Sequence, residues 1–257
     1  MTILDWRLRK KLFFFLIFAV IVLLVAGFVA YRIIPEPSCT DRRQNQEEER
    51  IDCGGPNCAP CIEEKPDNLV VLWQRFFEVR TGVYDVAALV QNVNLTIGSD
   101  DVPYTFELFD KEGTRIIQKK ANTYVLPNQQ FLVFEGGLET GIRVPVRVSF
   151  QIKPFQWRPA EEQALPVIVS RSERQFTLER PRLLATITNN AFYDIRGLDV
   201  AVVVSDINGN AVGVGLSHVK LLPDSKNVEV AYTWPHPFAA LPSDVRYIIR
   251  KNPWLGL

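Results

Sequence analysis

Histidine is nearly missing from this chain, which has two histidines among its 257 residues. Histidine is the usual base beside a serine or cysteine nucleophile, and neither His218 nor His236 lies near a Gly-x-Ser-x-Gly or similar motif. A glycine-rich phosphate loop between a strand and a helix is missing too. We therefore predict that the protein is not an enzyme and has no catalytic residues, cofactor or metal. Both histidines are interpreted as surface or structural residues.

An excess of basic residues is also missing, because 29 lysines and arginines balance 29 aspartates and glutamates. Beyond Arg32 the balance is acidic, with 24 basic and 28 acidic residues. Proteins that bind nucleic acid need a basic surface to neutralise the phosphates. The distribution of charge therefore predicts that nucleic acid is not a partner.

Cysteine is absent outside one short segment, because all four cysteines lie between positions 39 and 61. Clustered cysteines in even number favour two disulfides where a segment is exported, and four cysteines allow three pairings. The alternatives are a four-thiolate zinc site, with Cys58 and Cys61 as one half, or unpaired thiols. Cys39 and Cys53 are too far apart in sequence to form the second half. We therefore predict disulfides, and the sequence leaves their pairing open.

A long hydrophobic run is present near the N-terminus, where Leu12 to Tyr31 are 20 residues without a charge. As a helix this run would span roughly 30 Å, which is about the thickness of the hydrocarbon core of a bilayer. A cleavable signal peptide is the main alternative, but its apolar region is typically about 7–15 residues long. Phe28-Val29-Ala30 is also a poor cleavage site. We predict an uncleaved anchor that contacts the lipid bilayer through Leu12 to Tyr31.

The flanks of this run predict its orientation. Arg7, Arg9, Lys10 and Lys11 precede the run, whereas only Arg32 follows it closely. The positive-inside rule then places the N-terminus in the cytoplasm. The expected location is the cell membrane, crossed once, with everything after the run on the extracytoplasmic side.

The segment after the anchor has too little apolar content to fold on its own. Residues 36–67 carry nine acidic and four basic side chains, so disulfides must offset the entropy that folding removes. Four oxygen-bearing residues in the segment would suit a hard cation, although a solvated acidic face is the favoured interpretation; they are Asp41, Asn45, Glu48 and Asp52.

A spacing that occurs twice defines the rest of the chain. Asn92 is followed by Asp110, Gly113, Pro127 and Trp157, at intervals of 18, 3, 14 and 30 residues. The second copy has the same residue types at intervals of 17, 3, 14 and 31, namely Asn189, Asp206, Gly209, Pro223 and Trp254. A period near 97 residues is the size of a small domain and not of a solenoid repeat.

Each copy has the pattern of short strands joined by turns. Residues 104–110 alternate between apolar and polar side chains, and Asn208-Gly209 separates two apolar runs in the manner of a hairpin. We predict a mainly β fold with two tandem immunoglobulin-like β-sandwiches, preceded by one transmembrane helix and a short disulfide-stapled segment. The predicted parts are a cytoplasmic N-terminus (1–11), the helix (12–31), the Cys-rich segment (32–67), the first sandwich (68–157), a linker (158–166) and the second sandwich (167–257).

Two stretches resemble known families. Residues 184–213, with a strand ending in Asn, an Asp-x-x-Gly hairpin and the later Leu221-x-Pro223, resemble the bacterial FxLYD-type immunoglobulin-like domain and, more loosely, the LEA-14/WHy β-sandwich family. Residues 39–61, which contain Asp-Cys-Gly-Gly-Pro, are similar to a short Cys-rich motif of bacterial surface proteins. The resemblances imply β-sandwiches on a bacterial surface, and these families have no single activity.

Aromatic residues are the remaining candidates for a binding site. Five of them would either form an exposed binding face or pack in the cores, and core packing is favoured; they are Trp73, Phe76, Phe77, Trp234 and Phe238. Trp157 and Trp254 recur with the repeat and are interpreted as plugs of the core or of the sandwich ends.

We expect a structural or interaction protein, a scaffold or subunit of a bacterial cell-envelope assembly with an envelope protein partner. Sheet edges would also accept a partner strand. One alternative is a free-standing module that binds glycan, peptidoglycan or lipid. The other is an enzyme with an unrecognised site, which would gather polar residues of both copies in a concave pocket with perturbed pKa values. Two separate convex sandwiches would argue against that enzyme.

Overall fold

The computed structural model describes residues 3–33, 38–41, 43–61, 66–176 and 180–254. The chain divides into two compact units, Met1–Ala59 and Pro60–Leu257. The predicted N-terminal, Cys-rich and second-sandwich parts therefore each include some residues outside the described ones, and each unit is considered by itself below.

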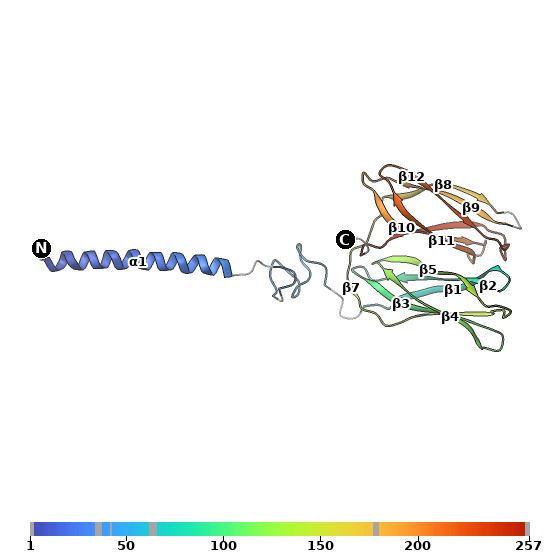
Figure 1. Ribbon diagram of the computed structural model, residues 1–257, viewed down its shortest axis with the longest axis horizontal. Coiled ribbons are helices and arrows are strands. Elements are labelled where there is room, and N and C mark those ends of the chain that lie inside the picture. Colours follow the sequence, from blue (N-terminus) through green and yellow to red (C-terminus); the bar gives the residue numbers. More distant parts are fainter. Residues whose placement is uncertain (1–2, 34–37, 42, 62–65, 177–179, 255–257) are drawn as a thin grey trace. The chain divides into compact units, whose positions relative to one another are not determined.

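The first unit begins with one long helix, α1 (Ile3–Ile33), which contains the whole predicted anchor (Figure 1). Its apolar side chains from Leu12 to Leu16 are each between 59% and 71% exposed. The described side chains of this helix leave out residues 3–9, 26 and 28–33. Among the side chains that are described, no helix is long and apolar enough to cross a membrane. The transmembrane assignment stays a prediction from the sequence.

The second unit is built from antiparallel strands, so the predicted mainly β class is confirmed. Its strands are β1 (Val70–Arg80), β2 (Val83–Asn92), β3 (Ile97–Phe109), β4 (Arg115–Val125), β5 (Gln129–Glu139), β6 (Arg147–Ile152), β7 (Arg158–Pro159), β8 (Val167–Gln175), β9 (Arg182–Asn189), β10 (Ile195–Ser205), β11 (Ala211–Leu222), β12 (Asn227–Thr233) and β13 (Asp244–Lys251).

The two sequence copies have the same strand order. In the first copy the sheets are β1-β2-β5 and β4-β3-β6, and in the second they are β8-β9-β12 and β11-β10-β13. Corresponding strands therefore occupy corresponding places, and each pair of sheets encloses its own core (Figure 1). Large buried side chains fill these cores, Phe106 and Phe131 in the first and Leu183 and Ile187 in the second. The internal repeat is thus a repeat of β-sandwich topology.

The repeated asparagines are buried hydrogen-bonding centres. Asn92 and Asn189 are 0% and 1% exposed. Asn92 Nδ2 donates to the carbonyl oxygens of Ile97 and Leu126, at 2.9 Å each. Asn189 Nδ2 donates to three carbonyl oxygens, and its Oδ1 accepts from Ala191 N at 2.9 Å. Each side chain ties the end of one strand to a loop on the opposite sheet, which explains why the repeat contains asparagine at this point.

The repeated Asp-x-x-Gly motifs form the hairpin turns that the sequence predicts. Asp206 Oδ1 accepts from the backbone N of Asn208 and Asn210, at 2.9 and 2.8 Å. Gly209 has a φ of 78°, a conformation that glycine adopts without steric strain. Asp110 Oδ1 likewise accepts from Thr114 N at 2.8 Å. These aspartates therefore cap turns.

The predicted linker and the repeated tryptophans lie at one end of the first sandwich. Within residues 158–166, Arg158–Pro159 forms the short strand β7, which pairs with Ile97 and Gly98 of β3. Trp157 packs against the first core. Trp254 is partly buried, and the Arg158 guanidinium lies 5.7 Å from the centre of its ring. The two tryptophans are therefore partly buried packing residues.

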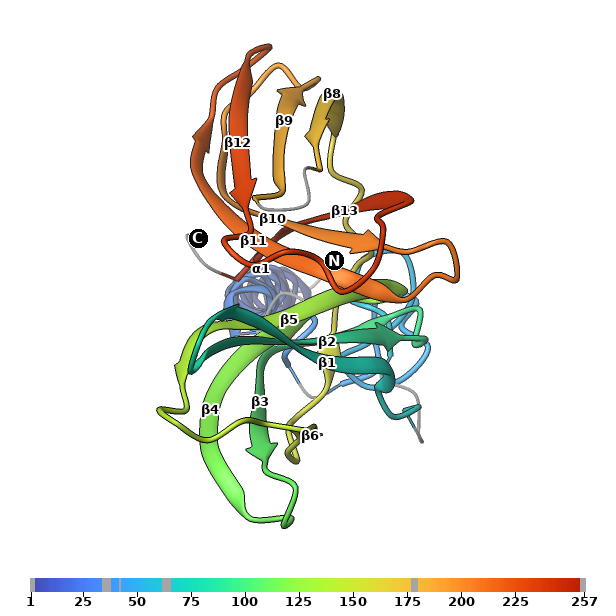
Figure 2. The same cartoon turned by 90° about the vertical axis from the view of Figure 1, so that its right-hand side faces the viewer.

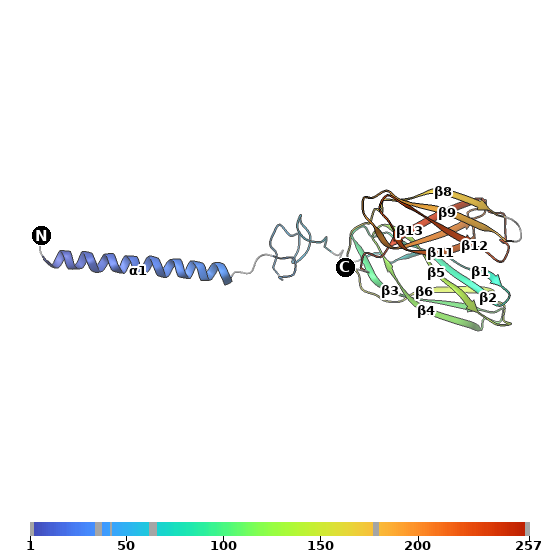
Figure 3. The same cartoon turned by 45° about the horizontal axis from the view of Figure 1, so that its top comes forward.

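The two sandwiches pack against each other through one sheet from each. The sheet β1-β2-β5 faces the sheet β11-β10-β13, as Figures 2 and 3 both show. A third apolar cluster fills the space between them and includes Ala87, Leu89 and Leu132 from the first copy, and Ala201 and Val203 from the second. The middle strands are therefore buried on both faces, and the sandwiches are not separate.

Replacement of a repeated asparagine tests its structural role. We expect Asn189→Ala to lower the free energy of unfolding by about 2–4 kcal/mol, because several buried carbonyl groups lose their donor. Denaturant unfolding of the full-length protein measures this loss. Asn227→Ala, at an exposed strand position, is the matched control and should change the free energy by less than about 0.5 kcal/mol. Equal effects of the two changes would contradict the assigned role.

Candidate functional site

The facing sheet of the second sandwich carries its interface side chains in rows across three strands. Because side chains alternate along a strand, positions 199, 201 and 203 of β10 face the first sandwich while 198, 200, 202 and 204 face the second core. The strand register aligns three rows: Val214–Val203–Arg246, Leu216–Ala201–Ile248 and His218–Asp199–Arg250. The first two rows are mainly apolar, and the third is charged.

Three arginines make hydrogen bonds across the interface. Arg75 Nη2 donates to Asn210 Oδ1 at 2.8 Å, and Arg246 Nη2 donates to Gln130 Oε1 at 2.7 Å. Arg250 Nη2 donates to the carbonyl oxygen of Tyr124. The interface therefore combines an apolar centre with directional polar contacts, which together fix the register of one sandwich on the other.

A pocket with a cavity volume of about 370 Å³ lies between the sandwiches beside the charged row. Its apolar lining includes Leu132, Phe134 and Leu216, and its polar lining includes Tyr124 and Arg250. The volume is within the range of about 300–1,000 Å³ that small-molecule sites occupy. Both copies of the repeat contribute to the wall, so the pocket exists only while they are packed together.

Arg250 is the most unusual residue of this pocket, because its charged side chain is only 5% exposed. Its guanidinium carbon lies 4.0 Å from the centre of the Tyr124 ring and 4.5 Å from that of Phe131. Burial lowers the pKa of Arg250, and the charges of Tyr124 and Asp199 act in the opposite direction. An arginine keeps its proton in spite of such a shift, so a positive charge is held at the floor of the pocket.

Two polar atoms of this region lack hydrogen-bond partners among the described residues, namely Arg250 Nε and the Tyr124 hydroxyl. Tyr124 is 7% exposed, and burial raises its pKa to about 12. Buried polar groups in folded proteins are nearly always paired. Both residues line the pocket, so its wall contains polar groups whose hydrogen-bonding capacity the described residues leave partly unused.

Asp199 and His218 form a cross-strand pair at the side of the pocket. His218 Nδ1 lies 2.9 Å from Asp199 Oδ1, and both residues line the cavity. Among the described hydrogen bonds, none joins His218 to a serine or threonine hydroxyl. The pair resembles the base and orienting carboxylate of a catalytic triad in part, but a nucleophile is not brought to it by the described part of the chain.

The residues of this site are not predicted together from the sequence, although the sequence contains one signal of it. His218 is interpreted from the sequence as a surface or structural residue, and the structure places its exposed side chain beside the pocket. Val200 to Val204 is an uninterrupted apolar run, and such a run is typical of a strand that is buried on both faces. The run therefore predicts that this strand has a second packing surface. Asp199 directly precedes the run, so it is expected at the margin of that surface.

The five predicted binding aromatics are distributed over three places and are all partly buried. Trp73 and Phe77 pack against the cluster between the sandwiches, and Phe76 packs against the first core. Trp234 and Phe238 pack against the second core, where Trp234 Nε1 donates to the carbonyl oxygen of Val214 at 2.8 Å. This placement agrees with the favoured interpretation as packing residues, and a binding role for them stays a prediction.

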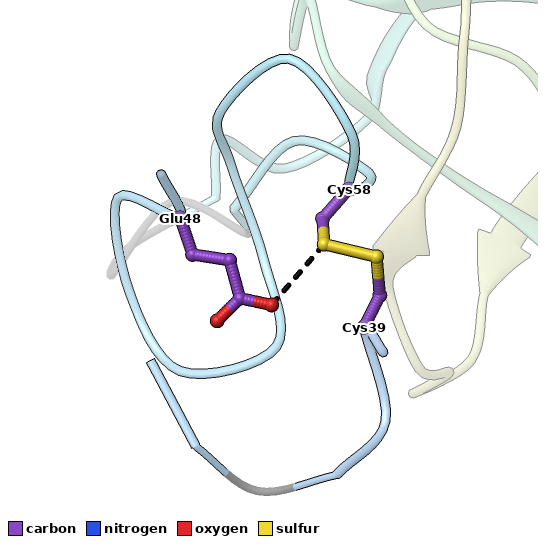
Figure 4. Close-up of side chains that lie close together, drawn as sticks. All are labelled: Cys39, Glu48 and Cys58. Atoms are coloured by element: carbon purple, nitrogen blue, oxygen red, sulfur yellow. Dashed lines mark hydrogen bonds between the residues drawn. A yellow bond between two sulfur atoms is a disulfide. The ribbon is translucent and has the colours of Figure 1, made fainter. Parts of the chain in front are cut away.

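The predicted disulfides of the Cys-rich segment are confirmed. Cys39 is bonded to Cys58, and Cys53 and Cys61 are disulfide-bonded as well. The zinc alternative is therefore wrong, because a bonded sulfur is not a thiolate ligand. The same holds for the close group of Cys39, Glu48 and Cys58, whose ligand atoms lie within 4.8 Å of one another (Figure 4).

Glu48 organises this segment from within. It is 5% exposed, and its Oε2 accepts from the backbone N of Asn45 and Asp52, at 3.2 and 3.1 Å. Its Oε1 lies 3.1 Å from Cys58 Sγ, the contact that is dashed in Figure 4. The carboxylate thus holds the loop between residues 45 and 52 against the disulfide.

The residues considered for a hard cation hydrogen-bond within the segment, although Asn45 Oδ1 has no partner among the described residues. Asp41 Oδ2 accepts from Asn45 Nδ2 at 2.8 Å, and Asp41 Oδ1 accepts from Arg43 N at 2.8 Å. The hydrogen bond from Asn45 lowers the pKa of Asp41. Together with the contacts of Glu48, these bonds assign the acidic residues to turn formation. The burial of Glu48, at 5% exposure, differs from the solvated acidic face that the sequence favours.

Comparisons with known proteins add little to this picture. No protein-family model matches the chain, and no curated protein matches it. Among solved structures, the crystal structure of red sea bream transglutaminase aligns with 71% of this chain and 30% of that chain, at 12% identity and a TM-score of 0.23. A likeness this low supports no inference, so the resemblance to FxLYD-type and LEA-14/WHy domains stays a prediction.

Removal of the buried carboxylate tests the organisation of the disulfide-stapled segment. We expect Glu48→Ala to speed reduction of the disulfides by dithiothreitol about tenfold, because the loss of two hydrogen bonds opens the loop more often. Alkylation of the released thiols at timed intervals, followed by mass spectrometry, measures the rate. Glu49→Ala, at an exposed neighbouring position, should leave the rate unchanged. Similar rates in the two variants would show that Glu48 does not protect the segment.

Tyr124 gives a prediction for alkaline pH. Its pKa of about 12 in the folded protein lies above the value of about 10 in an unfolded chain. The stabilisation that the buried neutral phenol of Tyr124 gives the folded state is therefore complete below pH 10 and is lost as the pH rises toward 12. We expect Tyr124→Phe to make that fall in unfolding free energy shallower, by up to about 1.4 kcal/mol per pH unit. Urea unfolding across this interval provides the measurement.

The same substitution should leave the free energy of unfolding at pH 7 nearly unchanged, because the Tyr124 hydroxyl has no hydrogen-bond partner among the described residues. Tyr193→Phe, which changes a tyrosine that is 60% exposed, is the matched control. A pH profile of Tyr124→Phe that coincides with that of the unchanged protein would contradict the assigned burial of the phenol.

Proposed function

We propose that this protein is a membrane-anchored extracytoplasmic interaction protein, a scaffold or subunit of a bacterial cell-envelope assembly. The observation that carries the proposal is the packing of two sandwiches into one unit through a shared apolar cluster and three arginine contacts. Such a unit presents the surfaces of both sandwiches to a partner in a fixed relative geometry.

The membrane anchor in this proposal is supported by the sequence of α1. Leu12 to Tyr31 lack charge, and the described apolar side chains along this run are largely exposed to solvent in the structure. A helix that is hydrophobic on every face is stable in lipid rather than in water. The basic residues before the run favour a cytoplasmic N-terminus.

A scaffold is favoured over an enzyme by the contents of the pocket. The pocket does gather polar residues from both sandwiches and does contain groups with shifted pKa values, as the enzyme alternative expected. Its Asp199–His218 pair, however, has no nucleophile among its described hydrogen-bond partners. The buried arginine and tyrosine are polar groups of the kind that orient a bound molecule.

A free-standing module for glycan, peptidoglycan or lipid is the second candidate. Several large apolar side chains at loops and turns favour it, because Phe192, Ile207 and Leu241 are between 77% and 92% exposed. These side chains would contact a ligand or a lipid surface without a protein partner. The two candidates differ in whether the relative geometry of the two sandwiches matters for binding.

Site-specific photo-cross-linking in native membranes tests the proposal. Cross-linkers at exposed positions of both sandwiches should capture one envelope protein from either sandwich. Ala201→Glu places a charge in the apolar cluster, where Ala201 is 3% exposed, and should separate the sandwiches at a cost of about 3–5 kcal/mol. We expect this variant to lose most of the cross-linking, at least about fivefold, because an intact interface fixes both contacts.

The matched control is Ala240→Glu, which adds the same charge at an exposed position and should leave cross-linking unchanged. Circular dichroism must show that Ala201→Glu keeps its strands. Cross-linking that is equal in the two variants would contradict the scaffold, and labelling of glycan or lipid alone would favour the second candidate. Recovery of the chain outside the membrane fraction would contradict the anchor.

A further inference from the structure

The pocket between the sandwiches holds a buried positive charge that no carboxylate of the described residues contacts directly. Among the described residues, no carboxylate lies within ion-pair distance of the Arg250 guanidinium. Asp199 is opposite Arg250 in the strand register, but its Oδ1 is paired with His218 Nδ1 at 2.9 Å. Asp100, also at the pocket, is paired with Arg158 at 2.7 Å. Asp199 and Asp100 therefore each have another partner, and neither forms an ion pair with Arg250.

Burial of a guanidinium in this way destabilises the folded state. Its removal from water costs several kcal/mol unless an anion or full hydrogen bonding compensates. Here the compensation is partial, because the side chain has one hydrogen bond to the Tyr124 carbonyl and two aromatic rings beside it. Arg250 Nε and the Tyr124 hydroxyl, both in side chains that are more than nine-tenths buried, have no partner among the described residues.

We propose that this pocket binds a small organic monocarboxylate, with its carboxylate on the Arg250 guanidinium and its apolar body against the walls between the sandwiches. The proposal goes beyond the scaffold function and does not depend on it. The guanidinium fork is matched in shape and charge to a carboxylate. Residues of both sandwiches line the pocket around Arg250, so a ligand would contact both sandwiches.

The remaining lining decides which anion fits. Leu132 and Phe134 from the first sandwich, and Leu216 and Ile248 from the second, give the cavity apolar walls, which favours a ligand with a hydrocarbon or aromatic portion. Asp199 lies beside the arginine, and its negative charge disfavours a doubly charged group such as phosphate. One carboxylate and an apolar body satisfy both conditions within a cavity of about 370 Å³.

Calorimetric titration of the full-length protein in lipid nanodiscs tests the proposal, with benzoate and hexanoate as probes and empty nanodiscs as the blank. We expect saturable binding with one site and a dissociation constant of about 1 mM or tighter. Benzamide and hexanamide, which have the same bodies without the charge, should bind at least about tenfold more weakly. Inorganic phosphate should also bind at least about tenfold more weakly than benzoate.

Two variants locate the binding at this pocket. Arg250→Gln should weaken benzoate binding at least about tenfold. Leu216→Trp should block binding while Arg250 stays in place, because Leu216 lines the cavity and is 43% exposed, so the larger ring enters the pocket without disturbing a core. This second variant keeps the test decisive if Arg250→Gln does not fold.

Arg182→Gln is the matched control, because Arg182 is exposed on β9 of the second sandwich and lies outside this pocket. It should leave benzoate binding unchanged. Three results would overturn the proposal: no saturable binding of either carboxylate up to about 20 mM, binding that survives Leu216→Trp, or phosphate and the amides binding as tightly as the carboxylates.

Discussion

The packing of one sheet from each sandwich against the other is the constraint on which the second unit depends. It buries the middle strands β2 and β10 on both faces, and it creates a pocket that neither sandwich has alone. The apolar cluster supplies most of the driving force, because burial of apolar surface is worth roughly 25 cal/mol per Å². The arginine contacts add direction, and Arg250 in particular ties β13 to Tyr124 of the other sandwich.

In this arrangement, corresponding strands of the two copies have different packing partners. The elements that every copy needs are the same in both, namely the buried asparagine and the capped hairpin. The sheets that meet are not the same, because the first copy uses β1-β2-β5 and the second uses β11-β10-β13, which corresponds to β4-β3-β6. The interface is therefore asymmetric, and residues such as Arg250 have a role in one copy only.

Much of the fold could be predicted from the sequence because its determinants are local. Gly113 and Gly209 are turn residues whose backbone needs a positive φ, and alternation of side chains along 104–110 reports a strand with one buried face. The four clustered cysteines predict disulfides because few other chemistries suit them. The pairing of Cys39 with Cys58, in contrast, depends on how the loop around Glu48 folds, and spacing does not contain that information.

The candidate site could not be predicted in the same way, because its residues are far apart in the chain. Tyr124, His218 and Arg250 meet only when two sheets pack face to face, and the pattern of apolar residues shows that a face is buried without showing what covers it. The amino-acid sequence by itself determined the class of fold, the repeat, its turns and the apolar run of α1, since these depend on neighbouring residues. Tertiary structure alone decided the interface and its buried arginine, because contacts between sheets are set by the complementarity of whole surfaces.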